Sequence, residues 1–388
     1  MYTEREVLDY IAEEDVKFGR LAFFDLNGVQ KNISIMAGQL EGAFQRGVGF
    51  DASAIYGFES AEKSDLFLFP DPATLSVLPW RPSSGKVVRL FCTIRYPDGR
   101  EYEKDFRSRL KNTVLAAREE CGVEFRIGTE IEFYLFKLDE AGRPTKVPFD
   151  RAGYMDIAPD DKGENIRREI CFTLEQMGIV PESSHHEEGP GQNEIDFHYA
   201  DAVTAADNAA TFKWIVRTRA ASAGLYADFS PKPLEGMAGS GFHINLSCSD
   251  PDKNVHALAG ILKHAREITY FLNCCEDSYR RLGENKAPKA ICWGHGDRLA
   301  LVRVPDVTDR GAARLEIRSA DCECNVYIVL DLLIRAAVDG IKAGLEPPPA
   351  SHAGEGNAAY LPASLKEAKK VAESSSFIKS VLGDAIEF

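Results

Sequence analysis

The stretch from Gly128 to Phe136 reads Gly-Thr-Glu-Ile-Glu-Phe-Tyr-Leu-Phe, and its density of apolar and aromatic residues is typical of a buried β-strand. Side chains alternate between the two faces of a strand, so Glu130 and Glu132 point one way while Ile131 and Phe133 point the other way. Two neighbouring carboxylates repel each other and are costly to bury. The pair is therefore either a solvated acidic face or a pair of ligands for a hard divalent cation such as Mg²⁺.

The same alternation of polar and apolar residues recurs in three later segments, which are 192–198, 243–247 and 314–318. An ordinary antiparallel sheet with one wet face gives such a pattern too. However, wet faces usually mix Lys, Thr and Ser, whereas these rows hold Glu, Gln, His, Asn and Arg, the groups that bind metal and phosphate. Four such rows predict a sheet curved around a charged funnel with helices outside. Several Mg²⁺ ions would neutralise its carboxylates.

Length and charge limit the remaining choices. A chain of 388 residues is too long for one core, so its length indicates two domains or three. The formal charge of −14 argues against a nucleic-acid partner, because phosphates would be repelled. No apolar run reaches the ~20 residues that cross a bilayer, and the polar amino terminus lacks a signal-peptide core, so we expect a cytoplasmic protein without a membrane partner.

Periodicity predicts an α+β organisation. The first ~100 residues combine a helix at 3–14, a hairpin around Asn27-Gly28 and proline-punctuated strands at 66–94, which indicates a small α+β domain. A long loop is predicted at 139–161 and a loop-rich stretch at 276–304. Beyond the first domain, helices are predicted at 106–120, 165–177, 203–223, 255–274, 327–343 and 365–382.

Loops between these elements carry further groups with chemical potential. His185 and His186 stand next to each other, which indicates either a transition-metal site or hydrogen-bonding loop residues. Gly239 begins a Gly-Ser-Gly loop that is only a weak phosphate signal, because no helix follows it. Five arginines gather late in the chain and form either a solvated basic face or a clamp for carboxylate and phosphate. With metal, the second reading indicates phosphoryl transfer from a nucleotide. The five are Arg281, Arg298, Arg303, Arg314 and Arg318.

Six motifs in order make the chain resemble the class I-type glutamine synthetases, with γ-glutamyl amine ligases as a divergent branch. They are Phe50-Asp-Ala-Ser-Ala-Ile, Gly128-Thr-Glu-Ile-Glu-Phe, His185-His-Glu-Glu-Gly-Pro-Gly-Gln-Asn-Glu, Pro231-Lys-Pro with Gly239-Ser-Gly-Phe-His, Arg298 with Arg303-Val-Pro, and Arg314-Leu-Glu-Ile-Arg-Ser-Ala-Asp with Asn325-Val-Tyr. The resemblance implies a β-grasp domain at 1–98 and a catalytic domain at 99–388 with a curved antiparallel sheet flanked by helices. It also implies a double hexameric ring with active sites between subunits.

The resemblance further implies roles for individual residues in joining glutamate and ammonia with ATP through γ-glutamyl phosphate. One Mg²⁺ or Mn²⁺ is implied at Glu132, Glu187 and Glu194, and a second at Glu130, His243 and Glu316. Glutamate and phosphate are implied to bind at Arg281, Arg298, Arg318 and the Gly239 backbone. ATP is implied to bind at Glu182, Asn245, Ser247, Arg303 and Arg314. Ammonium is implied to meet Asp51, from across the subunit boundary, and Tyr154.

The chain departs from the family pattern on the acceptor side. Lys286 precedes Ala-Pro in the flap where the family has a glutamate, and Glu284 is the nearest acidic substitute. Ala238 replaces an asparagine before the Gly-Ser-Gly loop. Three hypotheses follow: glutamine synthesis, γ-glutamylation of an organic amine by the same chemistry, and a non-catalytic relative that binds nucleotide or metabolite. The complete set of metal ligands weighs against the third.

Overall fold

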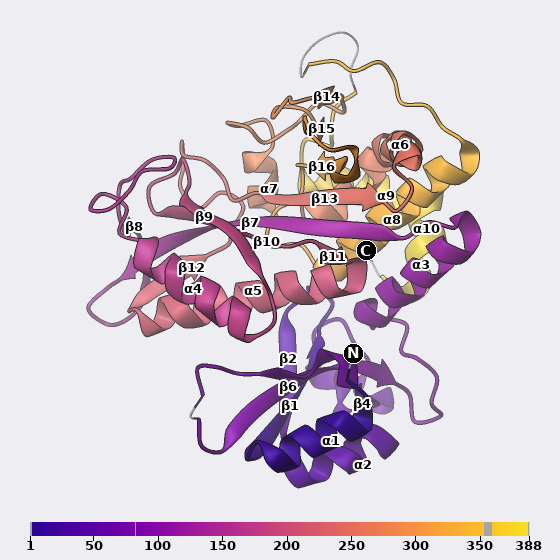
Figure 1. The fold of residues 1–388 in the computed structure, drawn as a ribbon. Helices are drawn as coiled ribbons and strands as arrows, with labels where there is room; N and C mark the ends of the chain where they lie inside the picture. Colours follow the sequence, from indigo (N-terminus) through magenta and orange to yellow (C-terminus); the bar gives the residue numbers. More distant parts are fainter. Residues whose placement is uncertain (1, 82, 353–358, 387) are drawn as a thin grey trace. The chain divides into compact units, whose positions relative to one another are not determined.

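The structure is a computed structural model that describes residues 2–81, 83–352, 359–386 and 388. The chain divides into two compact units, one made of residues 1–111 and 173–179, the other of residues 112–172 and 180–388 (Figure 1). The domain limits predicted from the sequence, 1–98 and 99–388, stay a prediction. Among the described residues, no helix combines the length and apolarity that a membrane span requires.

The smaller unit combines one β-sheet with short helices. Its sheet has the order β2-β1-β6-β4-β3, with β5 paired to β6, and only the β1–β6 pair among these pairings is parallel in the described chain. The predicted hairpin joins β1 to β2, and Gly28 has the positive φ of 74° that this turn requires. The elements are α1 Glu4–Glu13, β1 Val16–Phe24, β2 Gln30–Met36, α2 Leu40–Arg46, β3 Val48–Asp51, β4 Asp65–Pro70, β5 Ser76–Val77 and β6 Lys86–Arg95.

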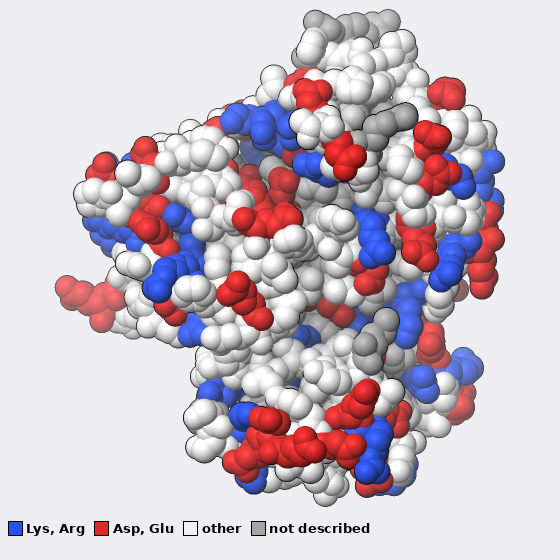
Figure 2. All heavy atoms as spheres, in the orientation of Figure 1, with Lys and Arg blue, Asp and Glu red and all other residues white. Residues whose placement is uncertain are grey.

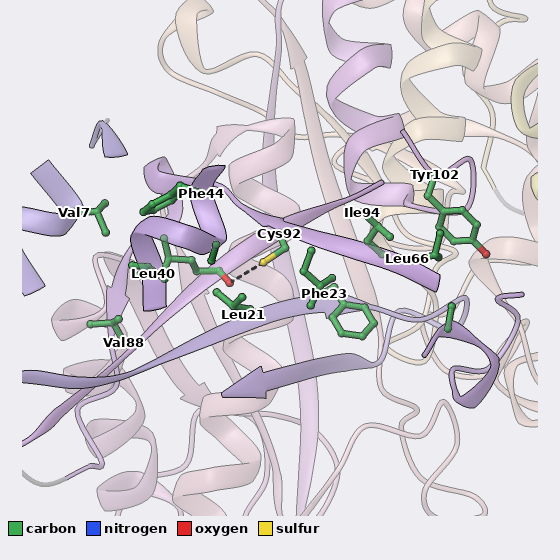
Figure 3. Packing of buried hydrophobic residues seen from close by; sticks show 14 of the residues in the cluster. Val7, Leu21, Phe23, Leu40, Phe44, Leu66, Val88, Cys92, Ile94 and Tyr102 are labelled. Carbon is green, nitrogen blue, oxygen red and sulfur yellow. Dashed lines mark hydrogen bonds between the residues drawn. The ribbon is translucent and has the colours of Figure 1, made fainter. Parts of the chain in front are cut away.

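Two features of α1 connect the sequence of this unit to its packing. Thr3 and Glu6 form a capping box that starts the helix. Val7 and Ile11 then fall on one helical face and are buried with Leu21, Leu40 and other residues of the core (Figure 3). The opposite face is polar, and Figure 2 shows acidic side chains in a row over α1.

The larger unit holds the sheet predicted to carry the site. Its strands run in the order β14-β15-β16-β13-β7-β10-β9, and β8, β11 and β12 also pair with β7. These pairings are antiparallel apart from β14–β15. The strands are β7 Phe125–Leu138, β8 Pro144–Pro148, β9 Pro181–His186, β10 Gln192–Phe197, β11 Ala200–Asp201, β12 Leu225–Asp228, β13 Phe242–Cys248, β14 Trp293–His295, β15 Val302–Val304 and β16 Leu315–Ile317.

Helices cover the apolar side of this sheet. Helix α5 packs against β7 and β12, and α8 packs against α5 and α6 (Figure 1). Two predictions need correction: β8 lies in the predicted long loop at 139–161, and α7, β14 and β15 lie in the loop-rich stretch predicted at 276–304. The predicted helix at 365–382 is two helices, because Ser375 is extended and caps the second one through Ile378 N. The helices are α3 Phe106–Cys121, α4 Glu164–Gln176, α5 Ala202–Ser222, α6 Asn254–Leu272, α7 Glu276–Arg281, α8 Val326–Ala343, α9 Leu365–Ser374 and α10 Ser376–Leu382.

The four strands with polar rows are direct neighbours, in the order β16-β13-β7-β10. Their register brings the polar residues of neighbouring strands opposite one another: Glu130 is opposite His243, and Glu132 is opposite Glu194. On the other face of β7, Phe133 is fully buried against aromatic rings of α5 and the loop after β12. The alternation in the sequence therefore separates an apolar packing face from a polar face, as predicted.

Candidate active site

The polar faces of these strands line a cavity of about 810 Å³ in the larger unit. Figure 2 shows basic and acidic side chains close together in this region, over β7 and β13. Its volume suits a ligand of metabolite or nucleotide size. Thirteen residues predicted from the sequence line it, and they are Glu130, Glu132, Tyr154, Glu187, Glu194, Gly239, His243, Arg281, Glu284, Arg298, Arg303, Arg314 and Arg318.

One cluster of metal-binding groups lies where β7, β13 and β16 meet. Glu130, His243 and Glu316 each offer one ligand atom, and these atoms lie within 4.8 Å of one another. The Nδ1 atom of His243 is 3.2 Å from Glu130 Oε2. Burial raises the pKa of Glu130, but the hydrogen bond and charge of His243 outweigh burial and lower it to about 2. The structure thus brings together the set that the resemblance implied for one cation.

A second cluster lies between β7, β10 and the loop that joins β9 to β10. Glu187 and Glu194 come together with His185, whose Nε2 donates to Glu187 Oε1 at 2.9 Å. Glu132 lies opposite Glu194 in the ladder. Burial and the charge of Glu132 raise the pKa of Glu194 well above its usual value. Such crowded carboxylates fit a divalent cation, which would relieve their repulsion.

His186 differs from its neighbour and serves the structure of the loop. It is fully buried, and its Nε2 contacts Asp150 Oδ1 at 2.9 Å. Its Nδ1 contacts the Glu187 carbonyl oxygen at 2.7 Å. Both ring nitrogens thus contact protein acceptors, which supports the hydrogen-bonding reading, and the same His186 also lies with Asp150 and Asp161 in a third group whose ligand atoms fall within 4.8 Å of one another. The contact with the Glu187 backbone steadies a predicted metal ligand.

Gln192 connects three walls of the cavity, and the sequence reasoning gave it no role. Its Oε1 accepts from Gly189 N at 2.8 Å. Its Nε2 donates to Glu132 Oε2 at 2.9 Å and to the Gly239 carbonyl oxygen at 3.1 Å. The same Glu132 oxygen accepts from Gly241 N at 2.8 Å. One buried amide therefore fixes the orientation of a predicted metal ligand relative to the glycine loop.

The Gly239-Ser-Gly loop approaches the site closely because its two glycines have no side chains. A Cβ on Gly239 would lie 2.5 Å from the Pro231 carbonyl oxygen, and one on Gly241 would lie 2.7 Å from His243 Nε2. The hydroxyl of Tyr134 donates to the carbonyl oxygen of Ala238 at 2.6 Å. These contacts give the loop a defined backbone position beside the clusters, which the weak glycine signal alone could not predict.

The arginines divide between structural bonds and the open cavity. Arg303 Nη1 contacts Glu316 Oε2 at 2.6 Å, and Arg318 also pairs with Glu316. Arg314 Nε donates to Asn245 Oδ1 at 3.1 Å. Arg281 is buried and donates to backbone carbonyl groups of residues 318 and 319, while Arg298 is exposed. The positive charges are therefore held on the β15–β16 side, next to the carboxylates.

The flap between residues 283 and 288 contributes an unexpected ion pair. The Nζ of Lys286 pairs with Glu188 Oε1 in the loop after β9, and it lies 5.8 Å from the centre of the Tyr154 ring. Glu188 stood inside a motif in the sequence, but no signal could connect it to a lysine 98 residues away. Glu284 lines the cavity two residues before Lys286.

Five predicted residues do not line the cavity, and one of them, Glu316, belongs to the first cluster. Asn245 donates to Glu130 Oε1 at 2.8 Å and so supports the first cluster from behind. Glu182 is 3.5 Å from His198 and half exposed, and Ser247 lies toward the end of β13. Asp51 lies in the smaller unit, where it is exposed and accepts from Ser53 N. Roles for these residues stay predictions.

Comparison with known proteins gives the class of the fold. Residues 15–97 match the β-grasp domain of glutamine synthetases, and residues 103–387 match their catalytic domain. The chain is 40% identical to glutamine synthetase of Methanosarcina mazei, covering 99% of this chain and 91% of the relative. It is 44% identical to glutamine synthetase of Staphylococcus epidermidis, covering 89% of this chain and 81% of the relative.

Solved structures agree with this class. A structure described as a GmaS/ADP complex has a TM-score of 0.87 at 28% identity, covering 98% of this chain and 92% of the other. Plasmodium falciparum glutamine synthetase has a TM-score of 0.88 at 23% identity, covering 99% and 93%, which shows a common fold. The chain therefore belongs to the glutamine synthetase family. The predicted fold class, a β-grasp domain before a domain with a curved sheet flanked by helices, is confirmed.

Proposed function

We propose that this protein is an ATP-dependent ligase that forms glutamine from glutamate and ammonia by way of γ-glutamyl phosphate. One observation carries the proposal: in a chain of this family, a single cavity gathers two carboxylate–histidine clusters and a row of arginines. The glutamate γ-carboxylate would attack the terminal phosphate of ATP, with ADP as the leaving group. Ammonia would then attack the acyl phosphate at its carbonyl carbon, which releases inorganic phosphate and a proton and forms the amide.

Two or more divalent cations, Mg²⁺ or Mn²⁺, would complete the site. Glu130, His243 and Glu316 would hold one of them. Glu132, Glu187 and Glu194 would hold another, with His185 beside them. A bound cation would neutralise phosphate charge during transfer. Burial is the main reason why the pKa values of Glu132 and Glu194 are raised. The raised values support this assignment, because the protein alone does not supply enough positive charge to balance the two carboxylates.

The chain's own residues would bind and orient the substrates. Arg281, Arg298, Arg318 and the Gly239 backbone would hold glutamate and the transferred phosphate. Asn245, Arg303 and Arg314, together with Glu182 and Ser247, would surround ATP. Tyr154 and Glu284, with Asp51 from a neighbouring subunit, would serve the acceptor. Support for these roles comes from the arginines of the first two groups, which line one cavity beside the clusters.

We also propose the assembly and the location that the family resemblance implies. A double hexameric ring would place Asp51 of one subunit at the cavity of the next. The net charge of −14 supports small-molecule substrates rather than nucleic acid or a membrane surface. A cytoplasmic location would give access to glutamate, ammonia and ATP.

The two other hypotheses have less support. An organic amine as acceptor rests on Lys286 and Ala238, but relatives at 40% identity or more are named glutamine synthetase. A non-catalytic relative would have no reason to keep both clusters of potential ligands.

Phosphate release from ATP tests the proposal directly, first with glutamate and ammonia and then with glutamate and a panel of small amines. Turnover that requires glutamate and saturates with ammonia at millimolar concentration is the expected result, with glutamine detected as the product. Turnover with an organic amine but not with ammonia would show that the acceptor is that amine. An absence of ATP hydrolysis with every acceptor would contradict the ligase.

A further inference from the structure

The groups around the Lys286 ammonium in the flap are those of a cation-binding site. A carboxylate from Glu188 and the ring of Tyr154 face the same ammonium group, which is the Nζ of Lys286. Carboxylates and aromatic faces are the two kinds of group that recognise a primary ammonium. The three residues come from three separate segments and all line the cavity.

The exposure of these side chains indicates how tightly the lysine is held. The side chains of Lys286 and Glu188 are 51% and 38% exposed, and Tyr154 is 50% exposed. An exposed ion pair favours the paired state by a factor of only about 1.4 to 5. The lysine therefore leaves the receptor readily, and a cation at millimolar concentration can compete with a flexibly tethered group.

We infer that Lys286 places its own ammonium in a cation half-site made by Glu188 and Tyr154, so that a cationic acceptor must displace Lys286 before it binds. This inference rests on the proposed function for its assignment of the acceptor. Lys286 is then a specificity-determining residue that lowers affinity for ammonium. Because the occupant is a primary alkylammonium, the half-site itself accepts ammonium and small unbranched primary amines in their protonated form.

Two substitutions separate the charge of the lysine from its volume. Lys286→Met removes the charge and keeps a linear side chain, so KM for ammonia should fall about two- to sixfold. Lys286→Ala also removes the methylene groups of a side chain that lines the cavity, and so leaves their volume free. This variant should gain n-propylammonium as a ligand, whereas Lys286→Met should gain much less. KM for ATP and for glutamate should stay within about twofold in both variants.

Two further variants serve as controls. Lys289→Met removes the same charge from the residue that directly follows the flap, but Lys289 does not line the cavity in the described chain, so its KM for ammonia should match wild type. Glu188→Gln removes the half-site, so KM for ammonia should rise and Lys286→Met should have no additional effect in that background. A purely structural latch would instead lower kcat and raise KM for ATP and glutamate together.

Ligand-observed NMR with n-propylammonium chloride tests the half-site without any turnover. Lys286→Ala should bind this probe at least threefold more tightly than wild type, and Lys286→Ala combined with Glu188→Gln should lose the gain. Equal binding by wild type and Lys286→Ala would overturn the inference, as would an unchanged or raised KM for ammonia in Lys286→Met. A wild-type protein without turnover would contradict the proposed function alone, because the NMR comparison still decides on the half-site.

Discussion

Replacing Gln192 with leucine tests whether a buried amide positions the metal ligands. The change keeps side-chain size but removes three hydrogen bonds, to Gly189 N, Glu132 Oε2 and the Gly239 carbonyl oxygen. Each neutral bond contributes about 1 kcal/mol and the bond to the charged carboxylate about 1.5 to 3 kcal/mol. Since Gln192 is only 1% exposed, water cannot replace these partners. The expected loss in the free energy of unfolding is roughly 3 to 5 kcal/mol.

The same change should reduce affinity for Mg²⁺, because Glu132 keeps only the bond from Gly241 N to hold its Oε2 atom in place. Residues that orient metal ligands typically affect metal affinity by about 10- to 100-fold. The assay is the rise of Tm with Mg²⁺ concentration, which measures binding to the folded state without requiring catalysis.

Thr113→Val provides the matched control for this experiment. It removes two hydrogen bonds of Thr113 Oγ1, which donates to Asp331 Oδ1 at 2.6 Å and accepts from Arg335 Nε at 3.1 Å, and Thr113 does not line the cavity in the part of the chain that the structure describes. This control should lose stability but respond to Mg²⁺ like wild type. If Gln192→Leu lost stability and kept wild-type Mg²⁺ affinity, the positioning argument would be refuted.

Three further changes address the same cavity and its surroundings. Glu132→Ala should abolish Mg²⁺-dependent phosphate release while circular dichroism stays that of a folded protein; surviving activity would show the ligand assignment to be wrong. Gly241→Ala places a Cβ 2.7 Å from His243 Nε2, so Mg²⁺ affinity measured by Tm shift should fall about tenfold or more. Burial raises the pKa of Asp321 in the folded protein to about 6, from 3.8 in the unfolded chain. The folded state therefore holds this proton more tightly, and the free energy of unfolding should fall as pH rises from about 4 to about 6. In wild type this fall in the free energy of unfolding should reach up to about 3 kcal/mol, and in Asp321→Asn it should be absent. Urea unfolding at each pH would measure the difference.

Local patterns in the sequence predicted the parts of the site that a strand carries by itself. Alternation alone placed Glu130 and Glu132 on one face of β7, and the register with β13 and β10 confirms that the polar rows of the strands meet. Periodicity also located most helices, because it depends on residues three or four apart. The break at Ser375 escaped this reasoning, since apolar spacing continues through both helices while a serine cap interrupts them.

Contacts between distant segments were beyond the reach of the sequence. The pairing of Lys286 with Glu188 depends on where two loops end after the sheet has formed, and neither residue carries a local sign of the other. The role of Gln192 was hidden for a related reason. A glutamine within a polar row predicts a polar face, but its three partners come from β7, the Gly239 loop and the turn before β10.

The charge balance of the cavity explains why the exchange at Lys286 can occur at little electrostatic cost. Among the described residues, seven carboxylates and six lysine or arginine side chains line the cavity, so it is close to neutral although the chain carries −14. ATP and glutamate add negative charge, which divalent cations would offset. When ammonium replaces the lysine ammonium beside Glu188, one monovalent cation takes the place of another, so the charge beside that carboxylate is unchanged. Salt weakens both contacts alike, so KM for ammonia in wild type should depend little on ionic strength. In Lys286→Met the opposing contact is gone, and KM for ammonia should rise with added NaCl, by at most about fivefold. Parallel salt dependence in wild type and Lys286→Met would contradict the exchange.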